Sequence, residues 1–325
     1  MGPRSDLLPF PNGWFVFGLS DELPPGKLLA RKFMGQEVTV FRTQSGQVYA
    51  VDSYCPHLGA HFGYGATVEG EVLQCPFHGF QFNGAGACVR TGYETPVPPK
   101  AKLRTWSLRE MDGFLLIYHH IDHEAPTWEI PSVGTSGWTQ LISRSFTLND
   151  HPQETTENSV DVGHFAFVHQ YRDPQTLKEF AADGAHLNTA YSVKRALRIF
   201  GINLTHYEFK FETQIYGLGY SLVNVHVPLF HVPLFHVTAR LWVLPTSIDA
   251  DRITLRLALR MKKWDFPLGA LLSPLVARMI LSGFVHDAGQ DFPIWENKRY
   301  TEVPALAKGD GPIGKYRQWA KQFYR

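Results

Sequence analysis

The feature that most constrains this chain is a pair of short segments, Cys55-Pro-His57 and Cys75-Pro-Phe-His78, separated by seventeen residues. Each segment carries one cysteine and one histidine. Two thiolates can hold one iron of a two-iron, two-sulfide cluster while two imidazoles hold the other iron. Because each segment then offers one ligand to each iron, the two segments must form facing loops that close over a single cluster.

Zinc is the alternative metal for these four residues, since cysteine and histidine are also zinc ligands. Zinc fingers usually pair cysteine with cysteine and histidine with histidine along the chain, whereas each segment here pairs one of each. A further alternative is four unrelated polar residues in a strand-rich region. The mixed pairing favours the iron–sulfur cluster over both.

Length and composition set the broad class of the protein. A chain of 325 residues exceeds the usual single domain, so we expect two domains. A net charge of +1 without a basic run argues against a nucleic-acid partner. Of three cysteines, only Cys88 lies outside the cluster motif, so no disulfide framework is possible. This cysteine usage suits a reducing compartment and predicts a cytoplasmic protein.

The longest apolar run, Leu268 to Val285, is interrupted by Pro274 and Arg278. A membrane span prefers about 20 apolar residues without charge. We therefore expect no membrane span, with a helix lying on a membrane surface as the alternative. Residues 1–13 lack an apolar core and do not read as a secretory signal.

Short strands separated by turns are expected in the first part of the chain. Residues 38–42 and 48–51 flank a hairpin turn, and residues 106–109 and 114–118 flank Asp112-Gly113. Prolines and glycines mark a connecting segment around residues 121–137. We predict a cluster domain at 1–122, a connecting segment at 123–137 and a second domain at 138–325.

The second part of the chain alternates predicted helices with long strands. The sequence predicts an α+β domain in which a long helix closes over a curved antiparallel sheet. The expected helices are 153–169, a long helix that starts at Ser273-Pro274 and runs to about Gly289, and 314–324; the expected strands lie within 191–220, 239–244 and 253–261.

One short repeat stands out within this part. A five-residue unit is written twice and sets histidines at His226, His231 and His236. Prolines 228 and 233 exclude a regular helix and a central strand. This favours an apolar loop or edge segment over a set of metal ligands.

A second candidate metal site begins with Asp161-x2-His164-x4-His169. Two histidines and one carboxylate form the facial triad that holds non-haem ferrous iron and leaves positions open for dioxygen. The candidate carboxylates are Asp287 and Asp291, which stand one helical turn apart. Asp161 lies three residues before His164, close enough to orient its second ring nitrogen. A helix with two incidental histidines is the alternative.

The spacing of the two histidines makes a demand on the backbone. At about 100° per residue, a spacing of five separates His164 and His169 by about 140° around a regular helix. Both can reach one iron only if the helix is broken between them. We therefore predict a distortion at residues 165–168.

Both motifs, in this order, resemble those of the Rieske-type non-haem iron oxygenases, and the resemblance spans nearly the whole chain. Ala60 and Phe77 stand where the respiratory Rieske proteins carry disulfide cysteines. Within the family, His164-Phe165 with His169 and the segment Asp291 to Lys298 look most like the 3-ketosteroid 9α-hydroxylase and sterol 7-desaturase branch.

The resemblance implies an all-β Rieske domain followed by a helix-grip, START-like catalytic domain. It implies His164, His169 and Asp291 as the ferrous ligands, with Asp287 as the fallback for Asp291. It also implies a homotrimer, in which Asp161 bridges His164 to His78 or His57 of a neighbouring subunit.

The function implied is that of a terminal oxygenase, which uses dioxygen to hydroxylate a lipophilic, steroid-like or polycyclic substrate. Electrons from NADH or NADPH are expected through a separate reductase or ferredoxin, because no GxGxxG segment is present. Alternatives on the same scaffold are an aromatic or natural-product hydroxylase and an O-demethylase. Outside enzymes, the alternatives are a Rieske electron carrier and a lipid-binding protein.

Overall fold

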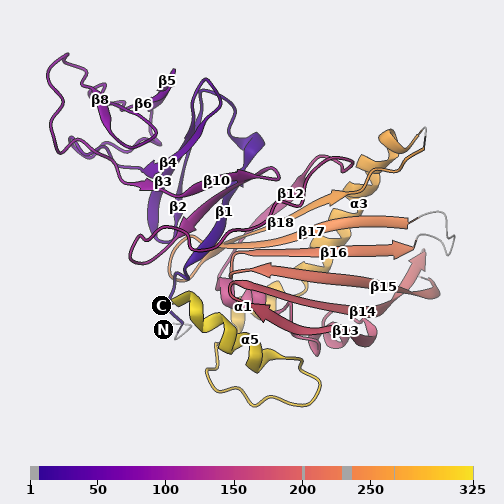
Figure 1. Ribbon diagram of the computed structural model, residues 1–325. Helices are drawn as coiled ribbons and strands as arrows, with labels where there is room; N and C mark the ends of the chain where they lie inside the picture. Colours follow the sequence, from indigo (N-terminus) through magenta and orange to yellow (C-terminus); the bar gives the residue numbers. More distant parts are fainter. Residues whose placement is uncertain (1–6, 200–201, 229–235, 267, 325) are drawn as a thin grey trace. The chain divides into compact units, whose positions relative to one another are not determined.

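The computed structural model describes residues 7–199, 202–228, 236–266 and 268–324, which divide into two compact units (Figure 1). The N-terminal unit is Asn12–Ser132 with Thr246–Ala250. The C-terminal unit is Val133–Pro245 and Asp251–Arg325, together with Met1–Pro11. The division after Ser132 falls inside the connecting segment predicted at 123–137. The sequence did not predict that residues 246–250 would belong to the N-terminal unit, or that the stretch before Asn12 would belong to the C-terminal unit.

The N-terminal unit consists of short strands in three sheets. The orders are β1-β11-β10, β2-β3-β4-β9 and β5-β6-β7-β8. At the predicted hairpin turn, Asp112 and Gly113 have φ of 53° and 91°, as a tight turn requires. The elements are β1 (Gly13–Leu19), a 3₁₀ turn (Ser20–Glu22), β2 (Leu28–Phe33), β3 (Gln36–Arg42), β4 (Val48–Asp52), β5 (Thr67–Glu69), β6 (Val72–Gln74), β7 (Gln81–Phe82), β8 (Cys88–Arg90), β9 (Thr105–Trp106), β10 (Leu108–Met111) and β11 (Phe114–His119).

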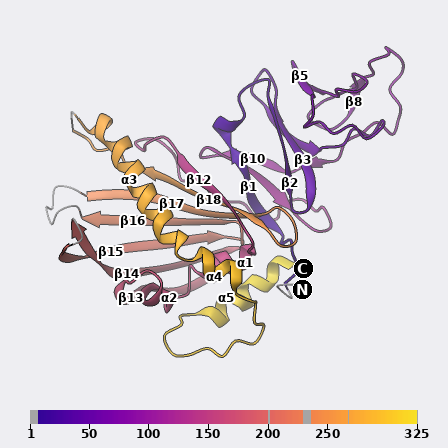
Figure 2. The same cartoon turned by 180° about the vertical axis from the view of Figure 1, so that it is seen from behind.

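The C-terminal unit is a seven-stranded antiparallel sheet with helices, in the order β12-β18-β17-β16-β15-β14-β13. Its long helix α3 packs against β18 and β12 and crosses one face of the sheet (Figure 2). The elements are β12 (Ile142–Leu148), α1 (Pro152–Glu157), α2 (His164–Phe167), β13 (Arg172–Asp183), β14 (His186–Ile199), β15 (Ile202–Tyr216), β16 (Tyr220–Pro228), β17 (His236–Ser247), β18 (Ile253–Met261), α3 (Gly269–Gly289), α4 (Phe292–Asn297), α5 (Ile313–Ala320) and a 3₁₀ turn (Lys321–Tyr324).

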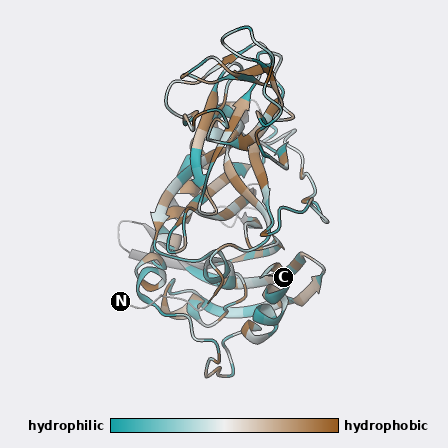
Figure 3. Cartoon of the chain, turned by 90° about the vertical axis from the view of Figure 1, so that its left-hand side faces the viewer, coloured by the Kyte–Doolittle hydropathy of each residue, from teal (hydrophilic) through white to brown (hydrophobic). Residues whose placement is uncertain are grey.

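The predicted fold class is confirmed: a strand-built domain precedes an α+β domain with a helix on an antiparallel sheet. The apolar residues, brown in Figure 3, are concentrated in the strands, and the connecting loops are more often hydrophilic. Buried aliphatic residues of β18 and α3 form the core between sheet and helix. The core therefore fixes where α3 and the segment that follows it lie.

Three helix predictions need correction. Residues 153–169 form two short helices, because the chain leaves helical geometry between α1 and α2. The long helix starts at Gly269, a turn before the predicted Ser273-Pro274, and Pro274 lies within it. A proline this close to the helix start removes only one hydrogen bond, to the carbonyl four residues earlier. The C-terminal helix becomes a 3₁₀ turn after Ala320.

The histidine repeat is described only at its edges. Residues 229–235, including His231, lie outside the described residues, so its interpretation as an apolar loop stays a prediction. Pro228 ends β16 and pairs with His236 at the start of β17. The His226 ring nitrogen Nδ1 lies 3.2 Å from the Thr238 hydroxyl.

Helix α1 begins with a side-chain cap. The His151 ring nitrogen Nδ1 accepts the N–H of Gln153 at 3.1 Å, and Pro152 occupies the first turn. Burial lowers the pKa of His151 to about 4. The ring is therefore neutral at physiological pH and able to accept this hydrogen bond.

The C-terminal helix α5 is attached to α1 by a buried ion pair. The Arg317 guanidinium donates to both carboxylate oxygens of Glu157 at 2.6 and 2.9 Å, and the two side chains are 15% and 9% exposed. Next to it, the Tyr316 hydroxyl donates to the Gln153 carbonyl at 2.8 Å. Removal of one partner leaves a buried charge without compensation, which is strongly destabilising.

We expect Arg317→Met to lower the free energy of unfolding by about 3 kcal/mol, because Glu157 loses its partner while the apolar stem is kept. Lys194→Met breaks the exposed Lys194–Asp173 pair of the same unit and should cost under about 1 kcal/mol. Urea unfolding followed by fluorescence measures both values. Equal losses would show that the α5–α1 pair adds no more than a surface pair.

Candidate metal centres

The two predicted cluster loops share one backbone arrangement. In each loop the cysteine N–H donates to the carbonyl five residues later, and the glycine four residues later donates back to the cysteine carbonyl. Both glycines have positive φ, of 75° and 67°. The donor–acceptor pairs are Cys55–Ala60 (2.8 Å), Gly59–Cys55 (2.9 Å), Cys75–Phe80 (2.8 Å) and Gly79–Cys75 (3.2 Å).

The four predicted cluster ligands lie together in the N-terminal unit. Cys55 and Cys75 are each 2% exposed and their thiols are free. The rings of His57 and His78 are 4.8 Å apart between centroids, and His57 stacks on Phe80 at 4.4 Å. The buried His78 nitrogen Nδ1 has no hydrogen-bond partner among the described residues. Two free buried thiols beside two imidazoles fit the ligand set of a mixed-ligand cluster.

Burial changes the pKa of the Cys55 thiol. Burial is the largest cause, and together with the neighbouring Cys75 it raises the pKa of Cys55 to about 12. A proton therefore stays on the sulfur unless a metal replaces it, which couples metal binding to proton release.

The second predicted site starts at a break in the α1–α2 segment. Gly311 allows this break, because a Cβ atom there would lie 2.3 Å from the Val160 carbonyl oxygen. The Val162 N–H donates to the Asp310 carbonyl at 3.1 Å instead of to a helical partner. Helix α2 then ends at Phe167, and Gln170 has φ of 57°. Helix α2 therefore ends between His164 and His169, as the spacing of the two histidines requires. The predicted distortion is a helix end and not a bulge.

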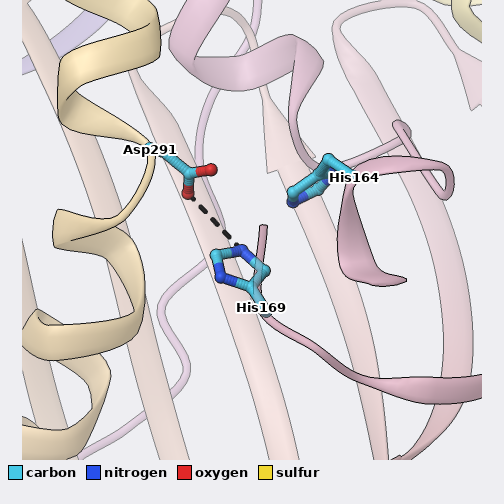
Figure 4. A group of neighbouring side chains, drawn as sticks. All are labelled: His164, His169 and Asp291. Carbon is cyan, nitrogen blue, oxygen red and sulfur yellow. Dashed lines mark ion pairs between the residues drawn. The ribbon is translucent and has the colours of Figure 1, made fainter. Parts of the chain in front are cut away.

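Three of the predicted iron ligands meet in the C-terminal unit (Figure 4). His164, His169 and Asp291 each offer one ligand atom within 4.8 Å of the other two. His169 Nε2 lies 3.5 Å from Asp291 Oδ2, and the two imidazole centroids are 5.0 Å apart. Burial raises the pKa of Asp291, while both imidazoles act to lower it. Two imidazoles and one carboxylate are the ligand set of a ferrous site with open positions.

The other ring nitrogens of these histidines face polar side chains. His169 Nδ1 donates to Gln290 Oε1 at 3.0 Å, which leaves Nε2 directed at Asp291. His164 Nδ1 lies 3.6 Å from Asp161 Oδ1, which accepts the His164 backbone N–H at 3.1 Å. Burial raises the pKa of Asp161, but the interactions with His164 outweigh it and the pKa is lowered. Gln290 therefore orients the His169 imidazole through a hydrogen bond, whereas Asp161 holds the His164 backbone and lies near its ring without a hydrogen bond to it.

Asp287, the alternative carboxylate, has other partners. The Arg195 guanidinium donates to its two oxygens at 2.6 and 2.9 Å, and the Tyr171 hydroxyl donates at 2.9 Å. The Tyr171 ring also lies 5.2 Å from the His169 ring. The geometry favours Asp291 as the ligand and gives Asp287 a supporting place beside it.

The triad forms part of the wall of a cavity of about 490 Å³. Most of the wall is apolar and comes from the sheet and α3. The sequence interpretation missed Phe209 and Phe211, although their alternation in a strand would place both on one face. It also missed Tyr171 and Arg195.

We expect Asp291→Asn to lower the iron content from about three to about two atoms per chain, because the mononuclear site loses its anionic ligand while the cluster keeps both irons. Asp287→Asn is the matched control and should keep about three. Iron and sulfide analysis of both variants, with the cluster absorbance, measures this. If only the Asp287 variant lost iron, Asp287 would be the ligand and Asp291 the supporting residue.

Comparisons with known proteins cover both units. Residues 13–106 match the Rieske [2Fe-2S] domain family and residues 117–324 match the 3-ketosteroid 9α-hydroxylase C-terminal domain family. Cholesterol 7-desaturase nvd 1 of Ciona intestinalis is 31% identical over 98% of this chain and 70% of its own length. The probable 3-ketosteroid-9-alpha-monooxygenase oxygenase component of Rhodococcus rhodochrous is 28% identical over 97% and 80%.

Solved structures agree on the fold. Dicamba monooxygenase bound to 3,6-dichlorosalicylic acid superimposes with a TM-score of 0.74 at 18% identity, over 96% of both chains. NdmA of Pseudomonas putida CBB5 with caffeine gives 0.72 at 19% identity, over 95% of this chain and 89% of that chain. With both domain families matched in order along one chain, this protein belongs to the Rieske non-haem iron monooxygenases, in the branch that carries the 3-ketosteroid 9α-hydroxylase C-terminal domain.

Proposed function

We propose that this chain is the terminal oxygenase of a multicomponent system and hydroxylates a neutral, steroid-like or other polycyclic substrate. The observation that carries the proposal is the triad of His164, His169 and Asp291 in the wall of an apolar cavity of about 490 Å³. Cavities of roughly 300–1,000 Å³ hold ligands of drug size. The names of relatives, a cholesterol 7-desaturase and a 3-ketosteroid monooxygenase, support a steroid.

The polar groups of the cavity favour an uncharged substrate. The charges of Arg195 and Asp287 are paired with each other, and the Tyr171 hydroxyl already donates to Asp287. Burial of an ionised ligand without a partner would be costly. The apolar strands therefore bind the substrate by burying its apolar surface, and the polar groups near the triad orient the substrate.

Each of the two metal sites has its own proposed ligands and its own role. Cys55, His57, Cys75 and His78 hold the [2Fe-2S] cluster in a domain at 1–122, and the triad holds Fe²⁺ in a domain at 138–325. When bound, the cluster supplies single electrons and the ferrous ion supplies the place of dioxygen activation. The chain itself positions the substrate, excludes water from the apolar cavity and orients the imidazoles. NADH or NADPH serves as the ultimate donor through a separate reductase or ferredoxin.

Exposed apolar side chains around the cluster loops support protein partners. Leu58, Tyr64 and Phe77 are 65%, 82% and 61% exposed, and they lie in or next to the loops that carry His57 and His78. Such an apolar patch is typical of a surface that another protein covers. A homotrimer would cover this patch by placing the cluster of one subunit against Asp161 of its neighbour.

Oxygen uptake with a surrogate ferredoxin and reductase tests the proposal. With NADH and a panel of steroids and small aromatic compounds, we expect substrate-dependent uptake for steroids only and a product heavier by one oxygen atom. His164→Ala should abolish uptake while the cluster absorbance persists. A fully loaded enzyme that turns over neither class would contradict the oxygenase proposal. Turnover of aromatic compounds alone would contradict only the substrate.

We expect Asp161→Asn to slow electron transfer to the ferrous site by about 100-fold or more, because the link between the two centres loses its charge while the iron content is kept. Single-turnover experiments with a reduced cluster, oxygen and substrate measure the rate of cluster reoxidation. Asp173→Asn, at the protein surface, is the control. An unchanged rate would limit Asp161 to orienting His164.

A further inference from the structure

Helix α3 exposes a continuous apolar stripe. Leu268, Leu271, Leu272, Leu275 and Met279 are between 36% and 73% exposed. At about 100° per residue, these positions fall within about 100° of one another around the helix. The opposite side buries Ser273, Ala277 and Leu281. In Figure 2 the helix lies on the outside of the sheet, with one side toward the strands.

Aromatic and basic residues precede the stripe along the chain. Lys262 and Lys263 are exposed, and the rings of Trp264 and Phe266 are stacked at 5.6 Å. This segment is joined to the start of α3, because the Trp264 backbone N–H donates to the Ser273 hydroxyl at 3.0 Å, on the side of the helix opposite the stripe. Arg278 is exposed on the flank of the helix. Apolar residues bordered by aromatic rings and cations are typical of helices that lie in a membrane interface.

We propose that this stripe docks the C-terminal unit on the surface of a bilayer that contains anionic lipids. The leucines would enter the boundary of headgroups and acyl chains, and the three cations would contact lipid phosphates. Residues 269–297 are long and apolar enough to cross a membrane, by length and composition alone. The helix instead lies on the bilayer, because its opposite side packs against β18 and β12 and its end presents Asp291 to the metal site.

The docking surface is continuous with the substrate cavity. Val276, Ile280, Gly283 and Phe284 of α3 line the cavity. Met279 lines the cavity and is also 73% exposed, so it belongs to both surfaces. A neutral polycyclic substrate concentrates in lipid. Docking would therefore bring the cavity wall to the place where the substrate is held, and this delivery role rests on the proposed function.

A two-fold pairing of two copies through the stripe is less favourable than docking on anionic lipids. In a two-fold pairing, the same surface meets itself. Lys262, Lys263 and Arg278 would then face cations of the other copy without carboxylates of equal number, since Asp265 is the one exposed acidic residue among residues 262–285. Anionic headgroups complement this charge.

Vesicle flotation of the loaded enzyme tests the docking. We expect binding to phosphatidylcholine vesicles that contain phosphatidylglycerol and weaker binding to phosphatidylcholine alone. The double variant Leu271→Asp/Leu275→Asp should bind about tenfold less or weaker still, since two apolar anchors are lost. Lys262→Glu/Lys263→Glu should reduce binding about tenfold, and only for the anionic vesicles. Val303→Asp, at an apolar side chain that is 86% exposed in the same unit, should change nothing.

Three results would overturn the proposal. The first is absence of binding by the wild type to anionic vesicles, and the second is equal binding to both vesicle types. The third is a leucine double variant that binds vesicles like the wild type but shows a smaller molecular mass by light scattering, which would make the stripe an interface between copies. Unchanged thermal melting of the variants confirms that they fold.

Turnover separates docking from substrate identity. With a steroid carried by cyclodextrin, the leucine variant should match the wild type, because neither leucine lines the cavity. With the same steroid embedded in vesicles, it should be slower by about tenfold. Vesicle binding without turnover in either format would refute the proposed substrate and leave the docking in place. If the leucine variant matched the wild-type rate with both cyclodextrin-carried and vesicle-embedded steroid, delivery from the bilayer would be refuted.

Discussion

The packing of α3 against the sheet is the contact on which the metal site depends. Its buried face meets β18 and β12, and the chain continues from its end directly into Asp291. The imidazoles of His164 and His169 come from a segment more than 120 residues earlier. Only a rigid tertiary contact can hold side chains so distant in sequence within 4.8 Å of one another. The geometry of the site is thus a property of the core.

The ligand-bearing segment around α2 has little support of its own, since a helix of four residues is not stable alone. Contacts from the C-terminal part of the chain replace it. The Gly311 backbone lies against Val160, the Asp310 carbonyl accepts the Val162 N–H, and Arg317 pairs with Glu157 at the end of α1. Residues 310–317 therefore stabilise the segment that carries His164 and His169.

The sequence predicted what chemistry constrains most tightly. Cys55, His57, Cys75 and His78 were predicted as cluster ligands because metal ligation fixes residue types and spacing, and the four side chains lie together. The interruption between His164 and His169 followed from helical geometry alone. Asp291 and Asp287 could not be separated by spacing, because the choice depends on Arg195, which no local pattern connects to Asp287.

The misses have physical reasons too. Strand β13 is almost wholly exposed and polar, so it lacks the alternation that marks a half-buried strand. The start of α3 was placed at Pro274 because proline favours a first turn, but the helix already begins at Gly269, whose N–H donates to the Phe266 carbonyl. In both places tertiary contacts outweigh local preference.

Met279 gives the cavity an adjustable boundary. Its side chain is unbranched and can adopt many rotamers, unlike the β-branched valines elsewhere in the wall. A change of its χ angles would widen or narrow the cavity next to solvent without moving the α3 backbone or the attached Asp291. The shape of the cavity at the Met279 end can thus change while the positions of His164, His169 and Asp291 stay the same.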